Sequence, residues 1–391
     1  MAGRSLTPRE MLQYLVGFDT TSAKSNLALV DFVADYLDGH GIAVKLIHDE
    51  ARTKANLFAT VGPEAAGGVA LSGHTDVVPV AGQSWTGDPF ALAERGGLLY
   101  GRGAADMKGF IACALALVPE FLARRLLTPI HFALSYDEEV GCLGVRRMIP
   151  EIVANLPRPR LVIVGEPTGM RVVGAHKGIA VLTTIVTGKD GHSSRPREGV
   201  NAIAWAAEIV GFLSALADEL AAEAQPGDPF DPPGTTLNVG TIAGGTAVNI
   251  IARECRIHWE FRPVPGADPA AIRARLDDFV ASEVLPRMRR SDPRASVVTR
   301  LDVASPPLAG DPASPAVRLA RRLTGANETG TAAFMCEAGL YHAAGIPAVV
   351  CGPGSIAQAH QPDEFLAIEQ LDACAEFLRR LAAWAASGEA P

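Results

Sequence analysis

The first part of this 391-residue chain alternates short apolar runs with amphipathic, helix-like segments. Four apolar runs, at residues 56–61, 69–71, 130–134 and 161–164, contain no Asp, Glu, Lys or Arg. Such runs are typical of strands that helices cover on both sides of a largely parallel sheet. The alternation therefore predicts an α/β layer structure.

The pattern changes between residues 178 and 306. There the sequence predicts, in order, strand 180–187, helix 200–216, strands 237–242 and 254–261, helix 269–284 and strand 296–303. This βαββαβ order is that of a ferredoxin-like α+β domain. Beyond residue 306 the α/β pattern resumes, and the chain is longer than a single core usually becomes. We therefore predict a discontinuous domain, residues 1–177 and 307–391, interrupted by an inserted domain at 178–306.

Charge and cysteine usage narrow the class of protein. The formal net charge is −8 and the pI about 5.6, so the chain would on average repel a phosphate backbone. The sequence has no apolar run long enough to predict a membrane span, and its N-terminal segment has no signal-peptide pattern. The six cysteines occur singly, which favours reduced thiols. We expect a cytoplasmic protein without nucleic-acid or membrane partners.

Side chains of the types that bind metals follow four predicted strands, 69–71, 130–134, 161–164 and 347–351. They are His74 with Asp76, Glu138 with Glu139, Glu166, and His360. A further acid, Asp106, directly precedes a predicted apolar helix at 110–122. Open α/β sheets bind ligands at the carboxyl ends of their strands, so these groups can converge. Because the set contains His, Asp and Glu but no Cys, it favours zinc or a similar divalent ion.

Each of these features also has an ordinary structural interpretation. A histidine near a strand end is often packed in a core, a run of acids is often a solvated turn, and Asp106 before a helix is a normal cap. The placement of all of them at element ends favours a site, because unrelated groups would be scattered over both edges of the sheet.

Six motifs then identify a family resemblance. They are SGHTDVVP at 72–79, GRGAADMKG at 101–109, YDEEVG at 136–141, GEPT at 165–168, GHSSRP at 191–196 and GPGSIAQAHQPDE at 352–364. In this order, over essentially the whole chain, they resemble the M20 metallopeptidases, and the last motif is most similar to the acetylornithine deacetylase branch. The resemblance implies a catalytic α/β domain and an inserted lid domain through which a homodimer forms.

The resemblance also implies a centre of two divalent metal ions, Zn²⁺ or Co²⁺. Asp106 would bridge the two ions. One ion would bind His74 and Glu166, and the other would bind Glu139 and His360.

Three further residues would take part in the reaction. Asp76 would hold the His74 ring in its ligating tautomer, and Glu138 would be the general base. His192, in the inserted domain, would donate a hydrogen bond to the oxyanion across the dimer. A capping or solvent-exposed histidine beside Ser193 and Ser194 is the ordinary alternative for His192.

The substrate-binding residues are less constrained. Arg262 and Asn249 are candidates for the substrate carboxylate, which an Arg fork matches in geometry, although Arg262 could equally form a structural salt bridge. Glu337 is a candidate partner for a side-chain ammonium, with capping or ion pairing as its alternative. Cys336 stands where the family pattern has a small hydroxyl residue, so the pattern does not determine which substrate the pocket accepts.

Three functions follow as hypotheses. The first is hydrolysis of N2-acetyl-L-ornithine to L-ornithine and acetate in arginine biosynthesis. The second is a deacylase or dipeptidase of the same family that acts on another N-acyl amino acid or on succinyl-diaminopimelate. The third is a metal-free binding protein of this fold, which the complete set of candidate ligands disfavours.

Overall fold

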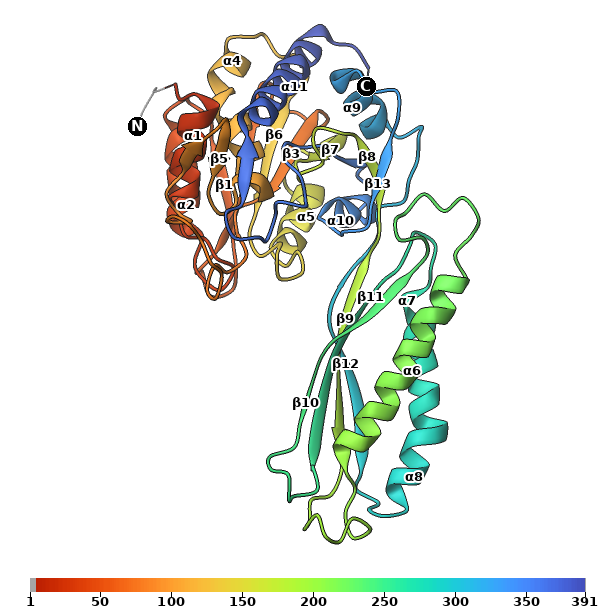
Figure 1. Ribbon diagram of the computed structural model, residues 1–391. Coiled ribbons are helices and arrows are strands. Elements are labelled where there is room, and N and C mark those ends of the chain that lie inside the picture. Colours follow the sequence, from red (N-terminus) through yellow and green to blue (C-terminus); the bar gives the residue numbers. More distant parts are fainter. Residues whose placement is uncertain (1–4, 391) are drawn as a thin grey trace. The chain divides into compact units, whose positions relative to one another are not determined.

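The computed structural model describes residues 5–390, which divide into two compact units (Figure 1). The first unit extends to Ala175 and continues with Leu308–Thr331 and from Cys336 onward. The second unit consists of His176–Pro307 and the short segment Ala332–Met335. The insertion expected from the sequence, 178–306, lies within two residues of the long segment of the second unit.

A mixed eight-stranded sheet is the centre of the first unit, in the order β1-β2-β6-β3-β7-β14-β8-β13. Its strands are β1 Val44–His48, β2 Ala55–Val61, β3 Val69–His74, β6 Ile130–Ser135, β7 Leu161–Val164, β8 Val173–His176, β13 Gly330–Ala332 and β14 Ala348–Val350. The central strands β6, β3, β7 and β14 are parallel, whereas β1, β2 and β8 pair antiparallel. The predicted α/β class with a mostly parallel centre is confirmed.

Helices pack around this sheet and a small second sheet lies beside it (Figure 1). The helices are α1 Pro8–Val16, α2 Leu27–Asp38, the π-helical turn η1 Ala104–Lys108, α3 Gly109–Ala116, α4 Val118–Leu122, α5 Val145–Ala154, α9 Pro315–Thr324, α10 Ala338–Ala343 and α11 Ile368–Ser387. The small sheet has the order β15-β5-β4, with β4 Ala93–Arg95, β5 Leu98–Tyr100 and β15 Phe365–Ala367. Every residue of α3 is buried, so this helix lies inside the core.

Local sequence explains where these helices begin and end. Helix α1 starts with a capping box, in which the Thr7 hydroxyl accepts from the Glu10 N–H and the Glu10 carboxylate accepts from the Thr7 N–H. The single helix expected at 110–122 is instead two helices that meet at Leu117. Pro119 lies in the first turn of the second helix, and it lacks the N–H that a continuous helix would require at that point.

The second unit is a four-stranded antiparallel sheet in the order β10-β11-β9-β12, with helices along one face (Figure 1). Its elements are β9 Ile179–Thr187, α6 Ala202–Ala222, β10 Thr236–Gly244, β11 Glu254–Arg262, α7 Pro269–Phe279, η2 Val280–Val284, α8 Leu285–Arg289 and β12 Ser296–Ser305. This is the βαββαβ order expected from the sequence. Burial alternates along β11, since one face packs on the helices, with Trp259 and Phe261 in the core.

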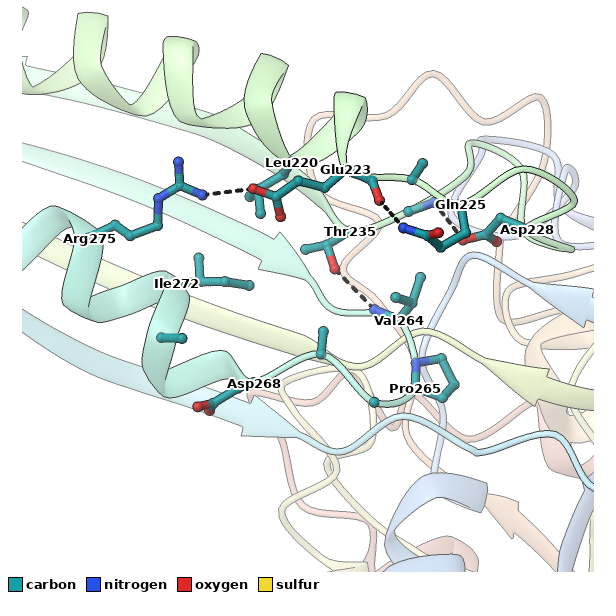
Figure 2. A pocket seen from close by; sticks show the side chains of 15 residues that line it. Leu220, Glu223, Gln225, Asp228, Thr235, Val264, Pro265, Asp268, Ile272 and Arg275 are labelled. Carbon is teal, nitrogen blue, oxygen red and sulfur yellow. Dashed lines mark hydrogen bonds and ion pairs between the residues drawn. The ribbon is translucent and has the colours of Figure 1, made fainter.

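The second unit also contains a hollow of about 510 Å³ between the end of α6 and the start of α7 (Figure 2). Its polar side chains bond to one another or to nearby backbone. Arg275 contacts Glu223, Gln225 donates to the Glu223 carbonyl oxygen, and the Thr235 hydroxyl accepts from the Val264 N–H. These contacts hold the surrounding loops together.

No helix within residues 5–390 combines the length and apolarity needed to cross a bilayer.

Candidate metal centre

The parallel strands of the first unit bring the candidate ligands to one edge of the sheet. His74 is the last residue of β3 and lies opposite Ser135, the last residue of β6. Glu138 and Glu139 come three and four residues after Ser135, and Glu166 follows β7 after Gly165. Since parallel strands end along a common edge, these residues meet although the sequence separates them.

A close approach between two elements fixes the end of β7. A Cβ on Gly165 would lie 2.0 Å from the ring of Phe110, which belongs to the buried helix α3. Only glycine therefore lets α3 pack against this strand end. Helix α3 directly follows η1, which carries Asp106. The packing of α3 against β7 therefore places Asp106 near the strand that leads to Glu166.

Asp106 lies between two sets of candidate ligands. Its Oδ1 is 3.0 Å from Nε2 of His74, which in turn lies 3.8 Å from Oε1 of Glu166. Its Oδ2 is 3.5 Å from Nε2 of His360, which lies 3.0 Å from Oε2 of Glu139. The two carboxylate oxygens of one aspartate thus face two separate His and Glu pairs, which is the arrangement that a bridging ligand requires.

The electrostatics of this cluster fit bound cations. Burial and the neighbouring Asp106 raise the pKa of both Glu139 and Glu166. Hydrogen bonds that the His360 ring donates to the carboxylates of Asp106 and Glu139 raise the pKa of His360 to about 10. In the described part of the chain, the buried Oε1 of Glu166 has no hydrogen-bond partner. Like charges crowded in a buried site and an unpaired carboxylate oxygen are both resolved by divalent ions, so the residues fit a two-metal centre.

Asp76 contacts both His74 and the segment that carries Glu138 and Glu139. Its backbone carbonyl oxygen is 2.9 Å from Nδ1 of His74, whereas its carboxylate Oδ1 is 3.6 Å from the same nitrogen. The carboxylate accepts from the N–H groups of Glu138 and Glu139, at 3.0 and 3.3 Å, and from the Ser22 hydroxyl at 2.7 Å. The backbone of Asp76 therefore orients the His74 ring, and its carboxylate holds the acidic turn after β6.

Glu138 lies beside the ligands with 8% of its surface exposed. Burial raises its pKa well above the ordinary value, while the positive charge of His74 opposes this shift. The Cys142 thiol donates to Oε1 of Glu138 at 3.2 Å. One carboxylate oxygen of Glu138 lies within 4.8 Å of ligand atoms of His74 and Glu166, so this group can exchange a proton with a water molecule beside them.

A buried ion pair holds the loop that carries Asp106. Glu364 accepts from the Arg102 guanidinium at 2.7 Å and from the backbone N–H groups of Gly103, Ala105 and Asp106. The side chains of Arg102 and Glu364 are each 1% exposed. Glu364 follows His360 in the same segment, so one carboxylate links the loops of two candidate ligands.

Three residues that the sequence analysis singled out belong to the second unit. His192 is exposed, and its Nδ1 lies 3.2 Å from the Ser194 N–H, which can only donate. The proton of the neutral ring is therefore on Nε2. Asn249 is exposed, and Arg262 donates from Nε to Glu260 at 3.0 Å.

Cys336 and Glu337 belong to the first unit and are 1% exposed each. The Glu337 carboxylate accepts from the hydroxyls of Ser72 and Ser135. Burial raises the pKa of Glu337 to about 7. Contact between this carboxylate and a substrate ammonium stays a prediction.

Four residues of this site lay outside the sequence-based assignment: Ser22, Arg102, Cys142 and Glu364. Arg102 and Glu364 occur within the quoted motifs, so the motif boundaries could have suggested them. Cys142 lies four residues after Glu138, which is one helical turn in spacing, but no motif marks it. Ser22 has no signal in the sequence, because its contact with Asp76 depends on the fold.

Comparison with known proteins identifies relatives of the whole chain. The model of Peptidase family M20/M25/M40 matches residues 70–384. An acetylornithine deacetylase of Pasteurella multocida (strain Pm70) is 37% identical over 362 residues, which cover 92% of this chain and 91% of the relative. An acetylornithine deacetylase of Myxococcus xanthus is 38% identical over 388 residues, which cover 96% of both chains.

Solved structures share the fold at lower identity. An M20 family metallo-carboxypeptidase from Sulfolobus solfataricus has a TM-score of 0.76 at 18% identity, covering 97% of this chain and 99% of that one. A dinuclear metal-binding peptidase of the M20 family from Bacillus subtilis has a TM-score of 0.64 at 17% identity, covering 96% and 97%. The family expected from the six motifs is confirmed: the chain is an enzyme that belongs to Peptidase family M20/M25/M40.

Proposed function

We propose that this chain hydrolyses the acetyl amide of N2-acetyl-L-ornithine to L-ornithine and acetate, in arginine biosynthesis. The observation that carries the chemistry is the position of Asp106 between the His74 and Glu166 pair and the His360 and Glu139 pair, with Glu138 alongside. The full-length relatives named acetylornithine deacetylase support the choice of substrate.

Five residues would hold two divalent ions, Zn²⁺ or Co²⁺: His74, Asp106, Glu139, Glu166 and His360. When bound, such ions polarise an amide carbonyl and lower the pKa of water. The rest of the chemistry is supplied by side chains. Glu138 takes a proton from the attacking water and delivers it to the leaving amine, because its carboxylate lies within 4.8 Å of His74 and Glu166. The Cys142 thiol donates to the Glu138 carboxylate, and the Glu138 backbone N–H donates to the Asp76 carboxylate, so both contacts hold Glu138 in place.

The residues of the second unit would complete the reaction. His192 would donate from Nε2 to the tetrahedral oxyanion, and the hydrogen bond that its Nδ1 accepts supports this tautomer. Arg262 and Asn249 would bind the substrate carboxylate. We propose that the enzyme is a homodimer through the second unit and that His192 acts on the partner's centre. We also propose that the enzyme works in the cytoplasm, in keeping with its six buried cysteines, which are thiols and not disulfides within residues 5–390.

The substrate is tested by release of free amine from a panel. We expect metal-loaded protein to release ornithine from N2-acetyl-L-ornithine faster than it releases amine from N-acetyl-methionine or succinyl-diaminopimelate. Chelation with EDTA should abolish all turnover, and added Zn²⁺ or Co²⁺ should restore it. Faster turnover of another acyl substrate would keep the proposed mechanism but assign a different substrate. The residues around Cys336 would then be the first to vary. Turnover that survives complete metal removal would contradict the mechanism.

Exchange of subunits tests the oxyanion role. The variants His192→Ala and Glu138→Ala should each lose roughly 10²-fold or more in kcat. Mixed dimers should regain measurable activity, because one centre then has an intact Glu138 and receives an intact His192 from its partner. The check is ornithine release after co-refolding, with each variant alone as the control. If the mixture is no more active than the separate variants, His192 does not act across a dimer.

A further inference from the structure

A buried polar cluster lies within the sheet of the first unit, below the edge that carries the candidate ligands. Its members come from β3, β6, the N-cap of α10 and α10 itself, and each is at most 1% exposed: Ser72, Ser135, Glu337 and Tyr341. Burying polar groups in an apolar core is unfavourable unless they bond to one another. This cluster therefore requires all of its hydrogen bonds to be made.

The hydrogen bonds converge on Glu337. Ser72 donates to Oε2 at 3.1 Å, and Ser135 donates to Oε1. Ser72 also lies 3.2 Å from the Tyr341 hydroxyl. Because the Ser72 hydroxyl has one proton and gives it to Glu337, Tyr341 is the donor in the contact between Ser72 and Tyr341. The two serine hydroxyls thus donate to the carboxylate, and the Tyr341 hydroxyl donates to Ser72.

This carboxylate lies on the same face of strand β3 as the side chain of His74. Side chains two residues apart on a strand point the same way, so Ser72 and His74 share a face of β3. Ser135 lies opposite His74 in the parallel pairing of β6 with β3. Glu337 bonds to both serines, so it links the ends of β3 and β6, the two strands that lead to His74 and to the segment with Glu138 and Glu139.

We propose that Glu337 is a positioning residue, which sets the spacing between the ends of β3 and β6 and thereby the affinity of the centre for divalent metal. The proposal rests on the proposed function, since it presumes that His74 and Glu139 bind metal. It differs from the sequence-based expectation that Glu337 pairs with the side-chain ammonium of the substrate. The two roles predict different changes in Glu337 variants.

The test is metal affinity in Glu337→Gln, which keeps the shape of the side chain but replaces one acceptor oxygen by an NH₂ group. Both serines then meet a side chain that can accept from only one of them. We expect the dissociation constant for Zn²⁺, measured by competition with a chromophoric chelator, to rise about 10- to 100-fold, as when partners behind metal ligands are removed. The visible spectrum of the Co²⁺-loaded protein should also change.

Two controls keep the test decisive. The exposed acid Glu64 in the same unit, changed to Gln, should leave Zn²⁺ affinity and the Co²⁺ spectrum unchanged. If Glu337→Gln does not fold, as judged by circular dichroism of the metal-free protein, Ser135→Ala removes only one donor and decides the question by the same measurements.

The outcomes are distinguishable. Unchanged metal affinity in the folded variants, with a KM raised for N2-acetyl-L-ornithine but not for N-acetyl-methionine, would assign Glu337 to the substrate ammonium and overturn the proposal. Weaker metal binding with equal effects on both substrates at saturating metal would support it. A wild-type protein that binds no divalent metal would overturn both this proposal and the proposed function.

Discussion

Replacing Glu138 by alanine lowers kcat by roughly 10²- to 10⁴-fold, while KM and the content of bound metal stay near the wild-type values. This is the expected result because the Glu138 carboxylate provides the proton transfer but is not one of the five proposed ligands. The side chain is buried beside His74, so its loss removes the base without opening the fold. Steady-state ornithine release and metal analysis of the same protein sample measure both quantities.

A neighbouring acid provides the matched control. Asp137 pairs with Lys54 at 2.5 Å, outside the cluster of ligands. Asp137→Asn keeps the size of the side chain, and asparagine tolerates the positive φ of 55° at this position. We expect this variant to retain most of its kcat. Near-normal turnover by Glu138→Ala with its metals in place would show that another group is the base.

The second large effect concerns stability. Replacing Glu364 by alanine should destabilise the first unit by about 3–5 kcal/mol, because it leaves the Arg102 guanidinium buried without its counter-charge. Three backbone N–H groups, those of Gly103, Ala105 and Asp106, lose their acceptor as well. The measurement is urea unfolding of the metal-free protein, so that changes in metal binding do not contribute.

An exposed pair in the same unit is the control for this prediction. Arg379 and Glu120 form a bidentate contact with side chains 41% and 44% exposed. Breaking it with Glu120→Ala should cost at most about 1 kcal/mol, because water screens the charges. If Glu364→Ala unfolded at the same urea concentration as Glu120→Ala, the buried pair would not stabilise the loop that carries Asp106.

The elements that matter for the site were predictable because each has a strong local signal. The strands that lead to His74, Glu138 and Glu166 are uncharged runs, which are typical of buried parallel strands. The βαββαβ order of the second unit follows from alternating patterns and clear loops. The order of the elements and the common edge at which parallel strands end were therefore sufficient to predict that the candidate ligands lie close together.

Elements at the sheet margins were not predictable in the same way. Strand β1 is half-exposed and contains Lys45 and His48, so it lacks the uninterrupted apolar run that marks the central strands. Strands β8 and β13 are short, and they exist because they pair with neighbours in the sheet. Pairing of this kind is a tertiary effect that overrides weak local preference.

The contacts behind the ligands were hidden for a further reason. The Asp76 carboxylate bonds to backbone N–H groups of Glu138 and Glu139, and every residue except proline has such a group. The bonds of Glu364 to the loop before Asp106 are of the same kind. Sequence identifies the acid but not its backbone partner, so these roles became evident only from the structure.

The discontinuity of the first unit has a consequence for the order of events during biosynthesis. A nascent chain that has emerged from the ribosome only through the second unit already contains His74, Asp106, Glu139 and Glu166. It still lacks the strand β14 and His360, which come from the last part of the chain. Such a chain has a complete ligand set for only one of the two proposed metal positions. The second unit, in contrast, is nearly contiguous in sequence and can fold before translation ends. The metal centre of the first unit is therefore completed after the second unit, which contains none of the five proposed metal ligands.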